Sequence, residues 1–202
     1  MKFLLIALLL VFTVSCAQEK KPILGDTPFQ KELNAEYKDA TTSPLKKKDR
    51  EHFEGLVFFA FDSAFVVTAS IERTPDSKWF EMKTTTDRLS QERVYGILNF
   101  ELKGTAYQLE LYQGQELMTK EGFEDYLFLP FLDNTNGDST YGGGRYIDLS
   151  IPEGDTLIVD FNTAYNPYCA YNEKYSCPIV PRRNYLDTDV TAGVKKFHKS
   201  EE

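Results

Sequence analysis

The sequence predicts a mainly β protein, an antiparallel β-sandwich or small barrel preceded by two short N-terminal helices. Three observations predict this fold. From about residue 56 onward, apolar and polar residues alternate with a period of two, which is typical of strands with one buried face. Strand-like runs recur at roughly ten-residue spacing with turn residues between them, as in sandwiches and barrels. Ahead of them stand two helix-start signals.

The two expected helices each begin after a Thr-Pro or Ser-Pro pair. In Thr27-Pro28-Phe29-Gln30, Thr stands as the N-cap, Pro at the first helical position, and Gln where it completes a capping box. Ser43-Pro44 repeats the signal, and a second helix is expected over residues 45–53, before Gly55. We interpret His52 within it as a surface or partly buried residue rather than a catalytic base.

The expected strands follow in chain order. Residues 65–71 and 79–85 form one hairpin around Thr74-Pro75-Asp76-Ser77, and residues 93–102 and 107–111 form a second around Lys103-Gly104. Further strands are expected over residues 126–131, 145–149, 157–161 and 189–197. Together they predict an antiparallel meander.

The N-terminus has the pattern of an export signal that ends in a lipidation site. Residues 3–14 are apolar apart from Thr13, follow a positive start, and lead to Ser15-Cys16. About twelve apolar residues are too few to span a membrane, which takes roughly 20. The junction resembles the lipobox of bacterial lipoproteins, although Leu is commoner where Thr13 stands. The alternative is a plain secretory signal cut near Ala17.

We therefore expect a signal peptide over residues 1–15, a tether over 16–26 that is lipidated at Cys16, and one domain over 27–199. The predicted location is the cell envelope, in the periplasm or outer membrane, with the lipid bilayer as partner through an N-terminal acyl anchor. The chain has 31 acidic and 23 basic side chains, a formal net charge of −8. That charge opposes binding to nucleic acid and to anionic lipid surfaces, so no nucleic-acid partner is expected.

The inventory of cysteine and histidine limits metal and redox chemistry. The chain has two histidines, so we expect no His-rich metal site, and no pattern indicates a cofactor. Cys169 and Cys177 remain once Cys16 carries lipid. Outside the cytoplasm, two cysteines eight residues apart favour a disulfide over a metal pair.

Two runs, residues 133–148 and 160–171, are dense in Asn, Asp, Tyr, Gly and Pro at positions that no hydrophobic pattern requires. Gly142-Gly143-Gly144 precedes a strand-like segment instead of the helix of a phosphate-binding loop, so we interpret it as left-handed or closely packed backbone. The first run also lacks the glycine and glutamate spacing of a calcium loop, and Asx turns explain its composition better.

A polar pocket is expected between the glycine run and the Cys169 loop. Arg145 could pair there with Asp133 or Asp160, or bind a ligand carboxylate or phosphate. The loop tyrosines either cover an irregular segment or wall the pocket. The candidate ligand-binding residues are Asp133, Tyr141, Arg145, Asp160, Asn162, Tyr165 and Asn166.

Three functions remain open at this point. The first is a module that binds a small polar or anionic molecule. The second is a carboxylate-dependent hydrolase, because neither histidine lies near a serine elbow motif or offers a clear Cys-His pair. Its candidate acids and bases are Asp133, Asp138, Asp148 and Asp160. The third is a structural envelope protein without a ligand.

Several motifs resemble the DUF1684 family of uncharacterised bacterial and archaeal proteins. They are Thr140-Tyr-Gly-Gly-Gly-Arg-Tyr146, Asp160-Phe-Asn-Thr-Ala-Tyr-Asn-Pro-Tyr-Cys-Ala-Tyr171, Cys177-Pro178, Pro181, Asn184 and Ala192-Gly193-Val194-Lys195. Val194 departs from the glutamate usual in the family, and Val180 from a common proline. The resemblance implies no known activity. It does imply that members without an export signal also carry both cysteines, which weakens the interpretation of the pair as an extracellular staple.

Overall fold

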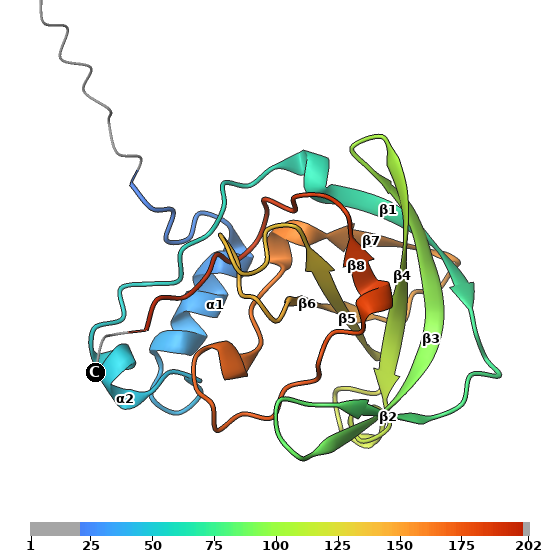
Figure 1. Ribbon diagram of the computed structural model, residues 1–202, viewed down its shortest axis with the longest axis horizontal. Helices are drawn as coiled ribbons and strands as arrows, with labels where there is room; N and C mark the ends of the chain where they lie inside the picture. The colour runs from blue at the N-terminus through green and yellow to red at the C-terminus, as the bar shows by residue number, and fades with distance from the viewer. Residues whose placement is uncertain (1–20, 200–202) are drawn as a thin grey trace, which may run out of the picture.

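The computed structural model describes residues 21–199, which fold around one strongly curled sheet (Figure 1). In sheet order, β6, β5, β4, β3, β1 and β7 lie side by side and are antiparallel, while β2 pairs with β3 and β8 runs parallel to β5. The strands are β1 (Val66–Arg73), β2 (Phe80–Lys83), β3 (Leu89–Leu102), β4 (Thr105–Gly114), β5 (Tyr126–Asp133), β6 (Arg145–Ser150), β7 (Thr156–Asp160) and β8 (Tyr185–Leu186).

The sheet is a curled half-barrel, so the prediction of a mainly β, antiparallel fold is confirmed, whereas the finer prediction of a β-sandwich or small barrel is not confirmed. One cause of the curl lies in β3, whose register against β4 shifts between Val94 and Gly96. A bulge of this kind increases local twist and bend. A Cβ on Gly96 would lie 2.8 Å from Ile71 Cγ1 and 2.9 Å from the Glu72 carbonyl oxygen, so glycine lets β3 and β1 approach at the bend.

One side-chain link and one backbone link connect strands of the curled sheet that do not otherwise pair. Where β4 and β5 diverge, the buried Asn184 amide donates to the carbonyls of Glu110 (2.8 Å) and Pro130 (2.7 Å) and accepts from the Glu110 amide (2.9 Å). Beyond β7, Tyr165 exchanges two backbone hydrogen bonds with Tyr146 of β6, at 2.9 and 3.0 Å. We call this Tyr146–Tyr165 bridge the seam, because it joins the two ends of the curled sheet.

The main core fills the concave side of the sheet. Every strand except β2 contributes residues to this core, as does the C-terminal segment. Its largest side chains include Phe65, Phe131 and Phe161. Burying one such side chain stabilises the fold by roughly 1.5–3 kcal/mol. The period-two alternation in the sequence therefore identifies the buried faces of these strands.

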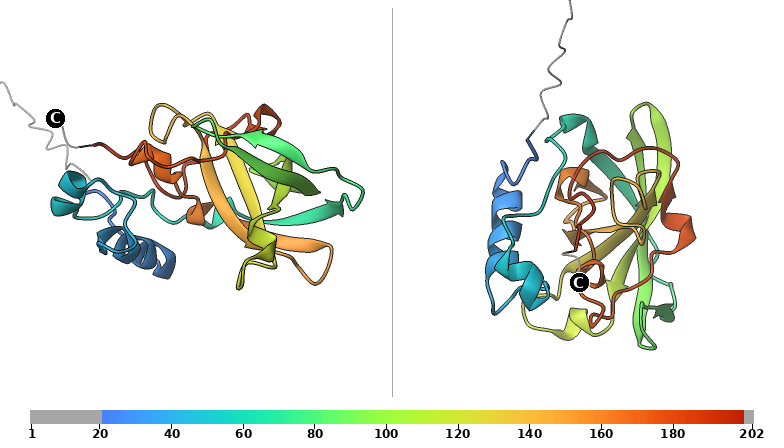
Figure 2. Two further views of the ribbon diagram at one scale, coloured as in Figure 1. Left: turned by 90° about the horizontal axis from the view of Figure 1, so that it is seen from below. Right: turned by 60° about the vertical axis from the view of Figure 1, so that its left-hand side comes forward.

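The helices lie on one side of the molecule, and irregular segments coloured orange to red lie between them and the sheet (Figure 2). Helix α1 (Pro28–Lys38) has the expected capping box between Thr27 and Gln30, and α2 (Lys47–Glu51) is shorter than expected. A second core cluster joins α1, and residues on either side of α2 such as Leu45 and Phe53, to the C-terminal half of the chain. Among the helices of the described residues, none has the length and apolar character needed to cross a membrane.

Two boundaries differ from expectation. Ile23 forms a backbone bridge with Phe58, so ordered packing begins inside the segment expected to be a tether. Residues 189–197 were expected to form a strand and do not. Val190 and Ala192 are buried and alternate with exposed residues, as in a strand, but their carbonyls accept hydrogen bonds from Arg145 instead of from a neighbouring strand.

Candidate functional site

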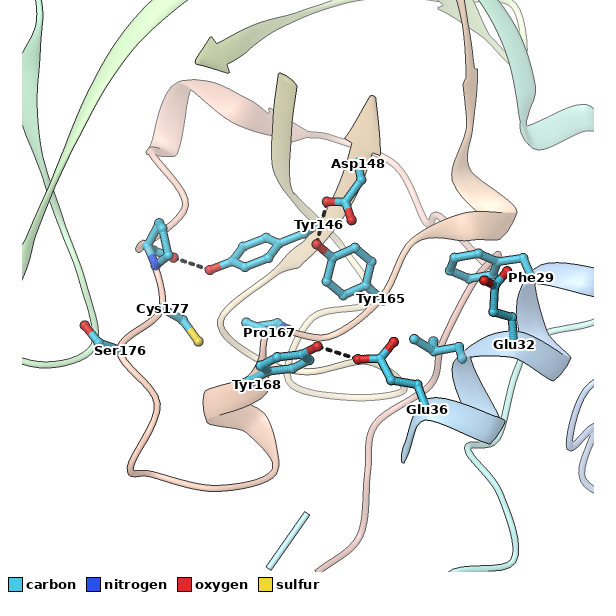
Figure 3. Close-up of a pocket in the computed structure, with 12 residues that line it drawn as sticks. Phe29, Glu32, Glu36, Tyr146, Asp148, Tyr165, Pro167, Tyr168, Ser176 and Cys177 are labelled. Atoms are coloured by element: carbon cyan, nitrogen blue, oxygen red, sulfur yellow. Dashed lines mark hydrogen bonds between the residues drawn. The ribbon is translucent and has the colours of Figure 1, made fainter. Parts of the chain in front are cut away.

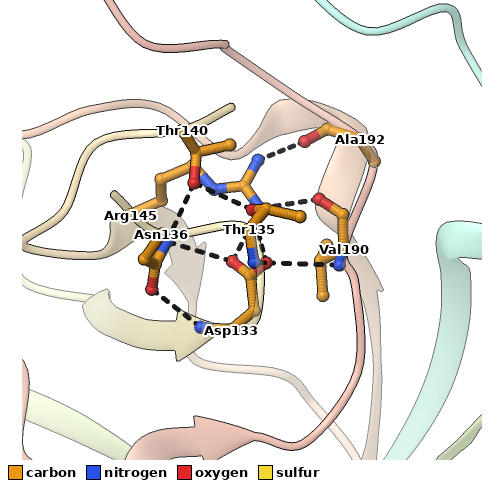
Figure 4. Close-up of polar contacts among 7 residues, drawn as sticks. All are labelled: Asp133, Thr135, Asn136, Thr140, Arg145, Val190 and Ala192. Atoms are coloured by element: carbon orange, nitrogen blue, oxygen red, sulfur yellow. Dashed lines mark hydrogen bonds and ion pairs between the residues drawn. The ribbon is translucent and has the colours of Figure 1, made fainter. Parts of the chain in front are cut away.

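Arg145 and Asp133 form an ion pair at the centre of the fold. The Arg145 Nη2 to Asp133 Oδ2 distance is 2.9 Å, and both side chains are fully buried. Nη2 also donates to the Val190 carbonyl at 2.8 Å, and Nη1 donates to the Ala192 carbonyl (Figure 4). Burial lowers the pKa of the guanidinium from its usual value, and Asp133 opposes that change. The guanidinium is therefore committed to internal partners.

The polar run before Arg145 serves the same pair. Asp133 Oδ1 accepts from the backbone and hydroxyl of Thr135, and Asn136 donates to Oδ2 at 3.2 Å. Gly144 has a φ of 89°, and a Cβ there would lie 2.6 Å from the Phe131 carbonyl oxygen. The glycine run thus brings the loop against β5, in agreement with the closely packed backbone expected from the sequence.

The other predicted ligand-binding residues lie in separate places. Asp160 and Asn162 hydrogen-bond each other, and Asn162 also holds the backbone of Asp62. Asn166 is buried and donates to the Lys195 carbonyl at 2.9 Å. The Tyr141 hydroxyl lies 3.9 Å from the sulfur of Cys169. The expected single polar pocket is therefore not formed by these side chains.

Two adjoining pockets form a groove around the seam. The first, of about 370 Å³, lies between α1, β6 and the loop that contains Cys177, and the second, of about 330 Å³, lies beside β3 and β5. They share walls of Tyr146, Tyr165 and Pro178, and we call them together the tyrosine groove. Of the seven candidate ligand-binding residues, only Tyr165 lines it.

Each wall of the first pocket follows from local structure (Figure 3). Residues Phe29, Glu32, Leu33 and Glu36 share one face of α1 because they are three or four positions apart. Tyr146 and Asp148 share one face of β6 because side chains in a strand alternate. The loop with Cys177 is held by backbone hydrogen bonds to the end of β2, such as Ile179 N to Lys83 O at 2.8 Å.

Tyrosine hydroxyls hold the carboxylates of this pocket. Asp148 Oδ1 accepts from Tyr126 at 2.8 Å and from Tyr165 at 2.6 Å, and Glu36 Oε1 accepts from Tyr168 at 2.6 Å. Burial raises the pKa of all three phenols well above the usual value, so they are neutral donors at physiological pH.

The charge of the first pocket has one sign. Its walls carry Glu32, Glu36 and Asp148, and no Lys, Arg or His stands among the described residues that line it. A cation that enters the pocket would be attracted by all of these carboxylates. The first pocket is therefore a negatively charged cavity with aromatic and aliphatic walls.

The second pocket contains a carboxylate that the sequence analysis did not select. Glu92 is 5% exposed; its Oε1 accepts from the Ser90 hydroxyl at 2.7 Å, and its Oε2 has no hydrogen-bond partner among the described residues. Burial raises the pKa of this carboxyl, against the hydrogen bond from Ser90 and the charge of Arg88. A Cβ on Gly114 would lie 3.3 Å from both carboxylate oxygens, so glycine leaves room for the group.

A signal for Glu92 does exist in the sequence. It stands two residues before Val94 in the sequence alternation of β3, and the bulge after Val94 places both residues on the sheet face opposite to Leu98, where Val94 packs with Tyr112 and Phe128. A carboxylate at such a position predicts either a buried partner or a functional site. The carboxylates of α1 carry no comparable signal, because only the fold brings them to the seam.

Comparison with known proteins now places the chain. The family model described as "Protein of unknown function (DUF1684)" matches residues 51–195. The chain belongs to the DUF1684 family. A solved structure of an uncharacterised protein of Haloarcula marismortui, determined by solution NMR, is 32% identical to this chain, with a TM-score of 0.65, and the match covers 82% of this chain and 89% of that one. The comparison with curated proteins returns no match.

The DUF1684 match divides the walls of the tyrosine groove. It includes β3, β5, β6, Tyr165 and the loop with Cys177, and it begins after α1. The α1 wall of the first pocket, with Glu32 and Glu36, therefore lies outside the residues matched by the family model.

We expect Asp133→Asn to lower the free energy of unfolding by about 3–5 kcal/mol, because it leaves the buried guanidinium without its counter-charge. Urea unfolding followed by circular dichroism measures the change. The matched control is Arg183→Gln, which removes the exposed partner of the Arg183–Glu110 pair and should cost under about 1 kcal/mol. Equal urea midpoints for Asp133→Asn and the wild type would contradict the role given to the pair.

We expect Glu92→Gln to raise the melting temperature at pH 7. The folded-state pKa of Glu92 is raised, so folding favours its neutral form; the stability from that form is present below the unfolded pKa and is lost as pH rises through the folded pKa. The gain from the substitution should therefore vanish as pH falls toward about 4. Differential scanning calorimetry across this range checks it, with the exposed Glu101→Gln on the same strand as control. A gain independent of pH would contradict the assignment.

Proposed function

We propose that this DUF1684 protein binds a small molecule that carries a positive charge beside an apolar or aromatic body, and that the tyrosine groove is the binding site. The observation that carries the proposal is the first pocket, where three carboxylates stand among tyrosines without a cation on its described walls. The second pocket adds Glu92 and Glu116 against Arg88 alone. Because burial disfavours the charge of Glu92, the negative charge of the groove is concentrated in the first pocket.

The chemistry of the walls supports an organic cation rather than an anion. A hydrogen bond to a charged group contributes roughly 1.5–3 kcal/mol, and an ammonium over a tyrosine face adds roughly 0.5–2 kcal/mol. Arg145, the cation considered for an anionic ligand, is fully buried and paired with Asp133. This revises the expectation of an anionic ligand, because the described groove offers such a ligand only Arg88.

Arg88 itself is held at the edge of the second pocket by other bonds. Its Nε donates to the Ser176 hydroxyl and its Nη2 to the Ser176 carbonyl, both at 3.0 Å. It thereby fastens the loop before Cys177 to the start of β3. We infer that the arginine shapes the groove and that the carboxylates contact the ligand.

Benzylamine and benzoate are matched probes for this proposal, since they share size and ring and differ in charge. We expect benzylamine to bind the full chain at least about tenfold more tightly than benzoate, a difference of about 1.4 kcal/mol. Titration followed by NMR shifts of tyrosine resonances measures both affinities. Tighter binding of benzoate would contradict the proposal.

Asp148→Asn should weaken benzylamine binding by roughly 10- to 150-fold, the range for one charged hydrogen bond, while Asn can still accept from both tyrosines. Asp155→Asn is the control, because its side chain is 85% exposed and lies outside the groove. A benzylamide separates binding from the carboxylate-dependent hydrolase considered above, because it has a hydrolysable bond. A binding protein leaves the benzylamide intact after incubation, whereas a hydrolase consumes it.

We also propose that the protein is anchored at the cell envelope by lipid on Cys16, which lies outside the described residues. The support is the twelve-residue apolar run that ends in Ser15-Cys16. Each acyl methylene buried in a bilayer contributes roughly 0.8 kcal/mol, so acyl chains would hold even an acidic body at a membrane.

Cells grown with a labelled fatty acid should label the wild-type protein and leave Cys16→Ser unlabelled. Membrane fractionation should then find the wild type with the membranes and the variant in the soluble fraction. Cys169→Ser, which keeps the N-terminal cysteine, is the control and should be labelled like the wild type. Label on Cys16→Ser would contradict the anchor.

A further inference from the structure

Cys169 and Cys177 face one another at the wall of the tyrosine groove. The backbone amide of Cys169 donates to the sulfur of Cys177 at 3.2 Å, and the Tyr141 hydroxyl lies 3.9 Å from the sulfur of Cys169. Both cysteines are free thiols in the structure, so the disulfide expected from their spacing is not present in it. The side chain of Cys177 lines the first pocket beside Pro167 and Tyr168 (Figure 3).

The two thiols differ in exposure and in acidity. Cys169 is partly exposed, whereas Cys177 is 7% exposed. A hydrogen bond from Cys177 lowers the pKa of Cys169 below its ordinary value, with help from Tyr141 and against burial. The same contact raises the pKa of Cys177, and burial adds to that change. One thiolate is therefore favoured at Cys169, with Cys177 as the neighbouring thiol.

Hydrogen bonds hold the backbone on both sides of the cysteine pair in the reduced state. The Thr85 amide donates to the Cys177 carbonyl at 2.9 Å, and the Cys177 amide donates to the Thr85 hydroxyl at 3.1 Å. On the other side, the Ala170 amide closes a turn on the Pro167 carbonyl at 2.9 Å. Both ends of the loop are thus held while the thiols are reduced. Among residues 21–199, no three His, Cys, Asp or Glu side chains gather as a metal site, so a third ligand for the pair is absent there.

We propose that Cys169 and Cys177 are a reversible dithiol–disulfide couple that exchanges with small disulfide compounds, with Cys169 as the attacking thiol and Cys177 as the resolving thiol. The Cys169 thiolate attacks one sulfur of the compound RSSR, which forms a Cys169–SR mixed disulfide and releases RS⁻. Cys177 then loses its proton to that leaving thiolate and attacks the Cys169 sulfur, which forms the internal disulfide and releases the second RS⁻. Two protein thiols are oxidised and one disulfide compound is reduced to two thiols.

Oxidised glutathione is the probe, used on the full chain in a Cys16→Ser background so that only the pair reacts. After incubation and acid quenching, intact mass spectrometry should show the protein short of two hydrogens, without a stable glutathione adduct. In addition, Cys177→Ser should accumulate one glutathione on Cys169, because no resolving thiol remains. Cys169→Ser should gain glutathione at least about tenfold more slowly, since Cys177 is buried.

Three results would overturn the couple. One is a stable glutathione adduct on both cysteines of the folded protein, which shows that the thiols react independently. Another is equal rates for Cys169→Ser and Cys177→Ser. The third is that the native protein does not react with oxidised glutathione, whereas the urea-unfolded protein, in which both thiols are exposed, does react. Circular dichroism of each variant verifies that it is folded. None of these readouts uses benzylamine, so the couple and the proposed ligand site fail or hold separately.

Discussion

The fold of this DUF1684 protein depends on one buried guanidinium. Arg145 begins β6, pairs with Asp133 at the end of β5, and binds the carbonyls of Val190 and Ala192 near the end of the chain. A charge in this position is costly without close partners, so the end of β5, the start of β6 and the distant residues 190–192 meet around it, while the Nε of Arg145 has no hydrogen-bond partner among the described residues. The same contacts occupy the carbonyls of Val190 and Ala192 and hold the start of β6 beside the end of β5.

The groove follows from how the curled sheet closes. An open sheet leaves unpaired backbone groups at its edges, and here the segment after β7 returns to β6 at the seam. The two tyrosines of the seam point their rings toward the pockets, while their backbones hold the sheet together. Tyr146 and Tyr165 therefore both close the sheet and line the groove. Asp148 lies on the same face of β6 as Tyr146, because it is two residues further along the strand.

Local signals predicted much of the fold, and contacts between distant segments account for what was missed. The capping box of Thr27 and Gln30 and the alternation in β1, β3 and β4 are properties of neighbouring residues, so the sequence shows them directly. Asn184, which joins β4 to β5, has no local pattern. Residues 189–197 alternate in sequence like a strand. Only the fold reveals that the Arg145 side chain donates hydrogen bonds to the carbonyls of Val190 and Ala192. For the same reason the polar runs predicted one pocket, whereas their side chains satisfy one another inside the protein.

The position of Val190 and Ala192 near the end of the chain also bears on when the protein can fold. While the chain is still emerging from a ribosome, Arg145 lacks two of its acceptors, and burial of its charge is penalised by several kcal/mol. The β-rich body is therefore held back from completing its core until almost the last residues are free.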